Sequence, residues 1–481
     1  MHCKRIKRRS VTAHRDAIAH NAAGVRHQEA SAMTEPSTHA PSWRVAALVG
    51  RAGTREVLVE ANVDGAWLPT VSGSIALEPF AADALGAVEA MLGMPVVPLR
   101  FTWLPADDWR SGTIVVEVEP LSTAPAGFRW QNTGELLEII EPDEARTVVR
   151  RRLGRLDGEP APFEPAWARS GWFARTSSWM VERLTDAGFA PTEAPRLAYQ
   201  GPLAAVLRAR SNGQATYLKC AAPAFGNEAS ITSVLARRTP DWVPAVIACE
   251  PTENWLLMHD HGGRTLDEGP EAAWIDAMPR VVELQRAWIG ATDAIVIAGG
   301  QRRPIADLSS SVPSMLERND LGGRLTPEIR ESWTAAVPRL VDACDALTDL
   351  GLPDTLVHGD LHPGNIVLTS NQHVVVDWSD AAVGNPLVDL PTFLLRTKDR
   401  ELRRRLWEAY ADGWDGILPL ARRDAAAGLA MTVGALYQVA TYQALLPAMD
   451  PPDRALFGGA DVSWVSRTLH GLEYGLDAGP T

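Results

Sequence analysis

The stretch LVHGDLHPGNIVLTSNQHVVVDWSDAAVGNPLVDL, residues 356–390, decides how the second half of this chain folds. It contains two short β-rich runs, Asn365–Leu368 and Val374–Val376, separated by a polar turn. Two such runs around a turn predict a β-hairpin.

Three polar side chains frame this hairpin: Asp360 just before the first run, Asn365 at its start, and Asp377 after the second. The hairpin is therefore expected to bring an acid, an amide and another acid to one edge. Transfer of a γ-phosphoryl group needs Mg²⁺, hard oxygen ligands for the metal, and a carboxylate that orients the attacking hydroxyl and accepts its proton. These residue types predict phosphoryl transfer, with Asp360 as the carboxylate and Asn365 and Asp377 as metal ligands.

The stretch resembles the aminoglycoside phosphotransferase and choline kinase-like families over about residues 165–475. Their HGDxxxxN motif matches His358–Asn365, and their hydrophobic-Asp-Trp motif matches Val376–Trp378. The resemblance implies a bilobal protein-kinase-like fold of the α+β class, with ATP or GTP as donor and Mg²⁺ as cofactor. It also implies that Asp360 is the catalytic base, that Asn365 and Asp377 bind Mg²⁺, and that Asp389 supports the loop.

A kinase also needs a cation for the α- and β-phosphates and a carboxylate that positions this cation. The Asn212-Gly213 pair between two short apolar runs predicts a hairpin whose second strand ends near Lys219. Glu228 follows Asn227, a residue type that caps helices, and begins a helical pattern. Lys219 and Glu228 thus resemble the kinase ion pair, although a surface lysine and a first-turn glutamate are the plain alternative.

The run Trp255–Met258 followed by His259-Asp260 predicts a strand and the hinge between two lobes, where backbone groups near Met258 and Asp260 would bind adenine. A buried strand followed by a turn explains the same pattern. The chain contains neither a Walker GxxxxGK[ST] motif nor a GxGxxG loop before the lysine strand, and it lacks the DFG and APE motifs of protein kinases.

The domain organisation is inferred from changes in composition and in secondary-structure pattern along the chain. We expect a disordered basic leader at 1–42, with Met33 as the alternative start, and a separate small α/β domain at 43–158. A Pro-rich linker at 159–168 then precedes a strand-rich N-lobe at 169–263 and a helical C-lobe at 264–475.

The α/β domain bears a weak resemblance to the Nudix fold, with Glu78 and Gly93 at positions of that family's box. The box positions that would carry metal-binding glutamates hold Ala87, Ala90 and Met91, and Glu89 alone does not replace them. We therefore expect this domain to be noncatalytic, and an unrelated α/β domain is nearly as good an interpretation.

Composition limits the class of protein. The formal net charge of −13 argues against a broad nucleic-acid-binding surface. The 481 residues are 46% hydrophobic, but no uninterrupted apolar run approaches the ~20 residues that a membrane-spanning helix requires, so we expect no membrane partner. The four cysteines are far apart and form no CxxC pair, which favours a reducing, cytoplasmic location over a disulfide framework or a zinc site.

Together these patterns predict an enzyme that phosphorylates a hydroxyl of a small molecule, such as an amino sugar, amino alcohol or sugar. The alternatives are a nucleotide-binding pseudoenzyme or regulatory module, and a protein-modifying kinase. Trp378, Trp407 and Trp414 would suit a cationic acceptor, but tryptophans of this kind are more often core residues.

Overall fold

The computed structural model describes most of the chain from residue 42 onward. The described residues are 42–51, 53–60, 66–73, 80–105, 111–120, 126–137, 140–141, 145–158, 164–370, 372–449, 453–454, 457 and 459–479. They fall into two units by their contacts, and we describe each by itself. The N-terminal unit contains the described residues up to 223 together with 448, 449, 453 and 454, and the C-terminal unit contains 224–447 and the described residues from 457 on.

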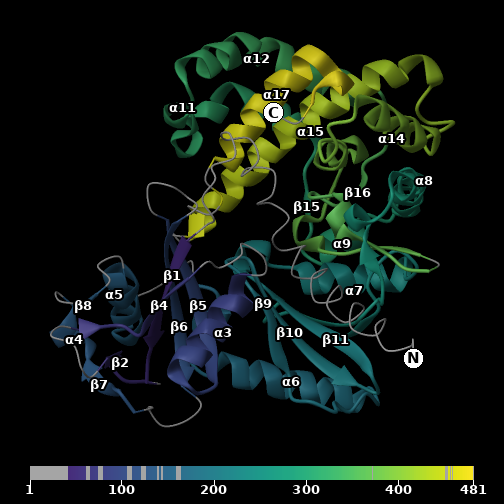
Figure 1. The fold of residues 1–481 in the computed structure, drawn as a ribbon. Helices are drawn as coiled ribbons and strands as arrows, with labels where there is room; N and C mark the ends of the chain where they lie inside the picture. Colours follow the sequence, from purple (N-terminus) through teal and green to yellow (C-terminus); the bar gives the residue numbers. More distant parts are fainter. Residues whose placement is uncertain are drawn as a thin grey trace, which may run out of the picture. The chain divides into compact units, whose positions relative to one another are not determined.

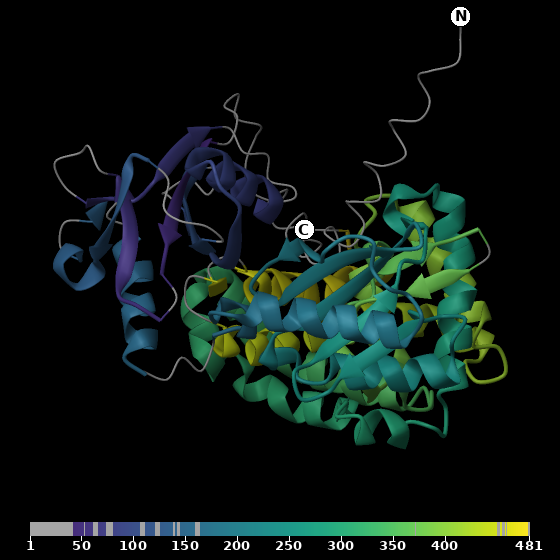
Figure 2. The ribbon, with the colours of Figure 1, turned by 90° about the horizontal axis from the view of Figure 1, so that it is seen from below.

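The N-terminal unit is built on a mixed sheet with a helix on each face (Figures 1 and 2). The strand order is β4-β1-β6-β5, in which β1 runs parallel to β6 and antiparallel to β4. The strands are β1 (Ser42–Val49), β4 (Thr70–Gly73), β5 (Val96–Pro105) and β6 (Ser111–Pro120).

Alternation along β1 explains the two layers. Val45, Ala47 and Val49 pack with α3 (Phe80–Leu92), whereas Ala46 and Leu48 point to the other face and pack with α5 (Ala145–Leu156). Successive side chains of a strand alternate between faces, so a continuous apolar strand predicts a sheet covered on both sides. This arrangement fits the predicted α/β character of 43–158.

The unit also contains two small sheets, β2 with β7 and β3 with β8. These elements are β2 (Glu56–Glu60), β3 (Ala66–Trp67), β7 (Phe128–Asn132), α4 (Thr133–Leu136) and β8 (Ile140–Glu141). The predictions for residues 1–41, Glu78 and 159–163 lie outside the described residues, and the boundary at 159–168 stays a prediction.

The unit ends with α6 (Trp172–Asp186) and the antiparallel strands β9 (Arg196–Gln200), β10 (Ala204–Ser211) and β11 (Gln214–Ala221). Asn212 and Gly213 join β10 to β11 with φ of 50° and 80°. Two positive φ values in a two-residue loop match the twist of a hairpin, so the hairpin predicted from Asn-Gly is confirmed.

The C-terminal unit opens with α7 (Glu228–Arg238), β12 (Val246–Glu250) and β13 (Trp255–His259). β12 and β13 are antiparallel neighbours. A short turn leads from β13 to β14 (Arg264–Thr265), which pairs with β17 (Ile366–Leu368).

The rest of this unit is mainly helical, so the predicted α+β class, with strand-rich segments followed by a helical lobe, is confirmed. Its helices are α8 (Glu271–Ala287), α9 (Asp293–Ile297), α10 (Ile305–Ser311), α11 (Leu321–Arg324), α12 (Pro327–Thr348), α13 (Leu390–Leu394), α14 (Arg400–Asp412), α15 (Arg423–Leu445) and α17 (Ala460–Tyr474). None of the described helices is both long enough and apolar enough to cross a membrane.

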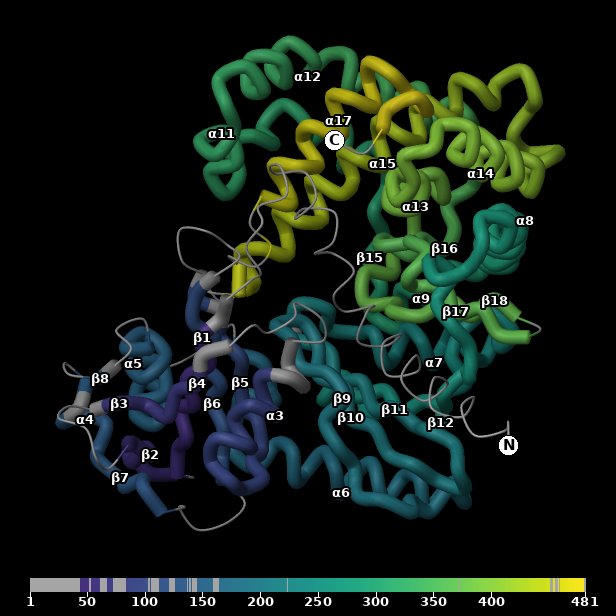
Figure 3. Tube along the Cα trace, viewed as in Figure 1, coloured from purple at the N-terminus to yellow at the C-terminus, as the bar shows by residue number. Residues whose placement is uncertain are grey.

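Helix α15 runs through the middle of the helical part beside α17 (Figure 3). It is buried around most of its circumference, which explains its Ala-rich sequence. Trp378, Trp407 and Trp414 are each at most 4% exposed and belong to the same core. These tryptophans are therefore core residues, not an aromatic surface for a cationic acceptor.

Candidate active site

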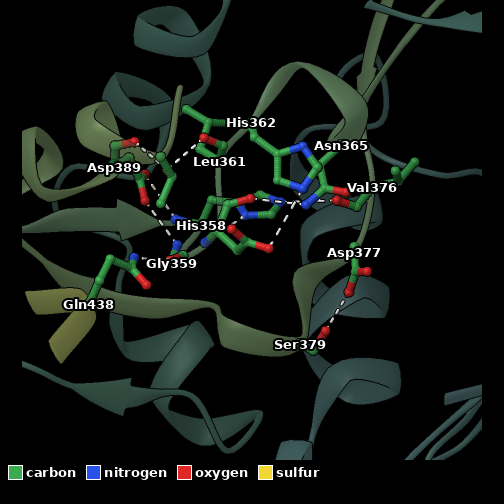
Figure 4. A network of polar contacts seen from close by, with 12 residues as sticks. His358, Gly359, Leu361, His362, Asn365, Val376, Asp377, Ser379, Asp389 and Gln438 are labelled. Carbon is green, nitrogen blue, oxygen red and sulfur yellow. Dashed lines mark hydrogen bonds and ion pairs between the residues drawn. The ribbon is translucent and has the colours of Figure 1, made fainter. Parts of the chain in front are cut away.

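The predicted hairpin is formed by β17 (Ile366–Leu368) and β18 (His373–Val375), within one residue of the predicted runs. Ile366 pairs with Val375, and the N–H of Val376 donates to the carbonyl of Asn365 at 2.9 Å. The hairpin therefore places Asn365 directly beside the residue that precedes Asp377 (Figure 4).

Asp360 lies in the loop between β16 (Thr355–Val357) and the 3₁₀ turn Pro363–Asn365. Its N–H donates to Nδ1 of His358 at 3.3 Å, and its side chain is 32% exposed. Burial raises the pKa of the Asp360 carboxyl to about 6, the charge of Arg396 opposes this rise, and Asp377 adds to it. A carboxylate with such a pKa is still ionised at neutral pH and is a better proton acceptor than an ordinary aspartate.

Asn365 is 1% exposed, and its Nδ2 donates to the carbonyl of Asp360 at 2.9 Å. This bond fixes the orientation of the amide. Its Oδ1 is buried and has no hydrogen-bond partner. A buried amide oxygen without a partner is costly, and a bound cation would satisfy it.

Asp377 directly follows Val376 and has φ of 65° and ψ of 66°, the left-handed conformation that non-glycine residues seldom adopt. Its half-buried carboxylate accepts a hydrogen bond from the Ser379 hydroxyl through Oδ1. Uncommon backbone conformations of this kind cluster at functional sites. Carboxylate and amide oxygens are the ligands that Mg²⁺ prefers, so Asn365 and Asp377 fit a magnesium ion.

The loop that carries Asp360 is fixed from its far side by Asp389, which is 1% exposed. The Asp389 carboxylate accepts the N–H groups of His358 at 3.0 Å and of Gly359 at 2.8 Å, and the amide of Gln285 at 3.1 Å. Burial raises the pKa of Asp389 to about 6, and these three donors oppose the rise. Asp389 thus has the loop-supporting position that the resemblance implied.

Gly359 adopts φ of +87°, and a Cβ on it would lie 2.5 Å from the carbonyl oxygen of Asp380. Only glycine fits this position. The carbonyl of Gly359 accepts a hydrogen bond from Nε2 of Gln438 at 2.6 Å, and Thr392 donates to the carbonyl of Leu361 at 2.6 Å.

Sequence reasoning missed Gln285, Thr392 and Gln438. They come from helices α8, α13 and α15, and no spacing ties them to the HGD triplet. Only an alignment or a structure connects such residues with the loop.

His358 has a structural role in this loop. Its Nε2 contacts the carbonyl of Val376 at 2.9 Å, and its ring packs on Trp378 with centroids 4.6 Å apart. Both contacts join the HGD triplet to the residues that follow β18.

Lys219 and Glu228 belong to different units, so their pairing stays a prediction. Lys219 is half-buried on β11, and Glu228 is 2% exposed at the first position of α7. Asn227 is the N-cap residue as predicted, but its side chain makes no capping hydrogen bond; its Nδ2 donates to the carbonyl of Gly299 at 3.1 Å. A tertiary contact has replaced the local cap.

Met258 lies near the end of β13, and Asp260 directly follows the strand; the hinge assignment stays a prediction. Met258 pairs with Val246, and Oδ1 of Asp260 accepts the N–H of Gly262 at 3.0 Å. The Asp260 carboxylate therefore shapes the turn. The chain then enters β14, whose partner β17 starts directly after Asn365.

In the N-terminal unit, Ala87, Ala90 and Met91 lie on α3. Oε1 of Glu89 accepts the N–H of Val96 at 3.2 Å, a structural contact between the helix and β5. Among the described residues, no group of three or more His, Cys, Asp or Glu side chains is placed to bind a metal ion.

Comparison with known proteins gives a family for the kinase-like segment. Residues 206–420 match the model of the phosphotransferase enzyme family. The match does not include residues 43–158, and the weak Nudix-like resemblance of that region is unsupported. A search of curated protein sequences gave no match.

Several solved structures are similar at low identity. A macrolide 2′-phosphotransferase type I is 17% identical, with a TM-score of 0.44, over 59% of this chain and 95% of that one. A macrolide 2′-phosphotransferase of Brachybacterium faecium is 21% identical (TM-score 0.40; 59% and 97%), and a choline kinase of Cryptosporidium parvum is 10% identical (TM-score 0.42; 59% and 91%). The family match, together with the HGD and Asp-Trp motifs, assigns residues 206–420 to the phosphotransferase enzyme family.

Proposed function

We propose that this protein transfers the γ-phosphoryl group of ATP or GTP to a hydroxyl of a small molecule. One observation carries the proposal: the buried Oδ1 of Asn365 has no partner, while the Nδ2 of the same amide donates to the carbonyl of Asp360. The metal ligand and the base are thereby fixed to each other at the end of one hairpin. Such positioning is the main contribution that a protein makes to phosphoryl transfer.

In this mechanism Asp360 accepts the proton of the acceptor hydroxyl while the oxygen attacks the γ-phosphorus and the bond to the nucleoside diphosphate breaks. Asn365 and Asp377 would bind Mg²⁺, which neutralises charge on the phosphate oxygens. Ser379 orients the Asp377 carboxylate, and Asp389 fixes the backbone of the HGD triplet.

For the nucleotide, we propose that Lys219 contacts the α- and β-phosphates, that Glu228 orients this lysine, and that backbone groups near Met258 and Asp260 bind the base. The position of Glu228 at the start of α7 and of Met258 at the end of β13 support this assignment. In the proposed division, the N-lobe is 169–263, the C-lobe is 264–475, and 43–158 is a noncatalytic domain joined by a linker at 159–168.

We place this activity in the cytoplasm, where ATP and GTP are abundant. Among the described residues, Cys220, Cys249 and Cys344 form no disulfide, which suits a reducing compartment. Neither a nucleic acid nor a membrane is needed for the reaction.

The test is a nucleotide-consumption screen of the purified full chain with Mg²⁺ over amino sugars, amino alcohols, sugars and macrolides. We expect one class to stimulate ATP or GTP hydrolysis and to gain a phosphate detectable by mass spectrometry. The Asp360→Ala variant should lose transfer by a factor of about 10² or more. Asp354→Ala, which alters an exposed aspartate, is the matched control.

The alternative functions have different outcomes in the same experiment. A pseudoenzyme would bind nucleotide without phosphate transfer to any acceptor, and Asp360→Ala would equal the wild type. A protein-modifying kinase would label proteins and not the small molecules of the panel.

A further inference from the structure

His362 is the one polar side chain of the HGDLHPGN loop that the proposed mechanism leaves unused. Its side chain is 2% exposed, and its Nε2 is buried with no hydrogen-bond partner. This Nε2 lies 3.7 Å from Oδ2 of Asp360. A buried ring nitrogen without a partner is energetically costly, so its position beside the base needs an explanation.

The His362 ring is suited to donate one hydrogen bond. Burial, together with the charges of Arg396 and His358, keeps its pKa well below the usual value, so the ring is neutral. A neutral imidazole carries a single N–H donor. The other charged groups that face Asp360 are Arg396 and Asp377, and Asp389 lies behind the loop.

The loop fixes the place of the ring. The carbonyl of His362 accepts the N–H of Asn365 at 2.8 Å, and Thr392 fixes the neighbouring Leu361 carbonyl. A Cβ on Gly364 would lie 2.9 Å from Cε1 of the ring, so a glycine is required for the ring to sit there.

A separation of 3.7 Å is too long for a hydrogen bond, whose usual upper limit is about 3.2 Å. A shift of roughly half an ångström would form one. Hydrogen bonds of catalytic groups are often long without substrate and shorten in the complex.

We propose that His362 is a positioning residue for the base. When the acceptor is bound, Nε2–H of His362 donates to Oδ2 of Asp360, which leaves Oδ1 directed at the acceptor hydroxyl. The hydroxyl proton passes to Asp360, and His362 neither gains nor loses a proton. This inference rests on the proposed role of Asp360.

The test compares three variants of His362 in the full chain. His362→Leu removes the donor and should lower kcat by about 10-fold to 100-fold, because a small misplacement of a catalytic group costs this much. His362→Gln places an amide N–H near the position of Nε2 and should recover most of kcat. His362→Asn is too short to reach Asp360 and should behave like the leucine variant.

The KM for nucleotide and the calorimetric affinity for Mg²⁺-nucleotide should stay unchanged in all three variants. The matched control is His470→Leu, since His470 lies on α17 and also has a buried ring nitrogen without a partner. It should leave kcat unchanged. If the leucine variant loses thermal stability, the difference in kcat between His362→Gln and His362→Asn still tests the proposal.

A double-mutant cycle separates positioning from a general structural role. In an Asp360→Asn background, single-turnover rates should not fall further when His362→Leu is added, because His362 acts through Asp360. The inference is wrong if His362→Leu keeps the wild-type kcat, if Gln is as slow as Asn, or if the loss persists in the Asp360→Asn background. Full activity of Asp360→Ala would instead overturn the proposed function itself.

Discussion

The Asp389 carboxylate accepts the backbone N–H of Gly359 at 2.8 Å, across thirty positions of sequence. The same carboxylate accepts the N–H of His358, so one buried acid fixes the two residues that precede the base. The shape of the HGD loop therefore depends on a side chain outside it.

Asp389→Asn should destabilise the protein and slow the reaction. The substitution places an NH₂ group against a backbone N–H, and hydrogen bonds to a charged group contribute about 1.5–3 kcal/mol each. We expect the free energy of unfolding to fall by roughly 2–4 kcal/mol in urea titrations. Asp354→Asn, at an exposed position, should change neither stability nor rate, and an equally stable Asp389→Asn variant would contradict the role given to Asp389.

Ser379→Ala should weaken Mg²⁺ binding more than it slows phosphoryl transfer at saturating Mg²⁺. The Ser379 hydroxyl donates to Oδ1 of Asp377, and loss of a group that orients a metal ligand typically costs about 10-fold to 100-fold in metal affinity. The Mg²⁺ concentration for half-maximal rate should rise by that factor, and Mn²⁺ titration followed by EPR should give the same ratio. Ser310→Ala, which removes an exposed helical hydroxyl, is the control.

Gly359→Ala should be more harmful than Gly351→Ala. Both glycines have positive φ, +87° and +75°, so both alanines bear a conformational cost of about 1–2 kcal/mol. Only at Gly359 would the new Cβ also meet a backbone atom, 2.5 Å away, whereas at Gly351 nothing lies within 4 Å. The difference between the two losses of unfolding free energy measures the cost of the steric clash at Gly359. Equal losses would show that the loop can move aside.

The rate should depend on pH through Asp360. Burial raises its pKa to about 6, so the base is ionised at pH 7.5 and becomes protonated as pH falls through this value. The value of kcat/KM should therefore be level near neutrality and decrease about tenfold per unit well below pH 6.

Arg396→Gln should move the acidic limb of the pH–rate profile to higher pH, because the arginine charge opposes the rise in the pKa of Asp360. Arg400→Gln, at an exposed residue four positions further along the chain, should not move it. A shift toward lower pH in Arg396→Gln would contradict the sign of this interaction.

Local patterns predicted the parts of the site that are contiguous in sequence. The hairpin around Asn365 and Asp377 and the turn at Asn212-Gly213 follow from apolar runs broken by turn residues. The helix start at Glu228 was also located correctly, but the role of Asn227 was not, because its side chain contacts Gly299 instead of the helix end.

What the sequence could not provide is the support of the loop by Gln285 and Gln438. These glutamines lie in helices whose pattern of apolar residues is the same whether or not a polar residue contacts the loop or its supporting acid. Such contacts arise from tertiary packing, and neither propensity nor spacing encodes them.

The pairing of β14 with β17 has a mechanical consequence. In the proposed assignment, β14 leaves the base-binding hinge, and β17 starts directly after Asn365, the metal-binding amide. These two strands are hydrogen-bonded to each other. A tilt of the hinge would therefore displace Asn365 through main-chain bonds alone. Binding of the nucleotide base and alignment of the metal would then be coupled through the backbone. Substitution of side chains along either strand would leave this coupling intact.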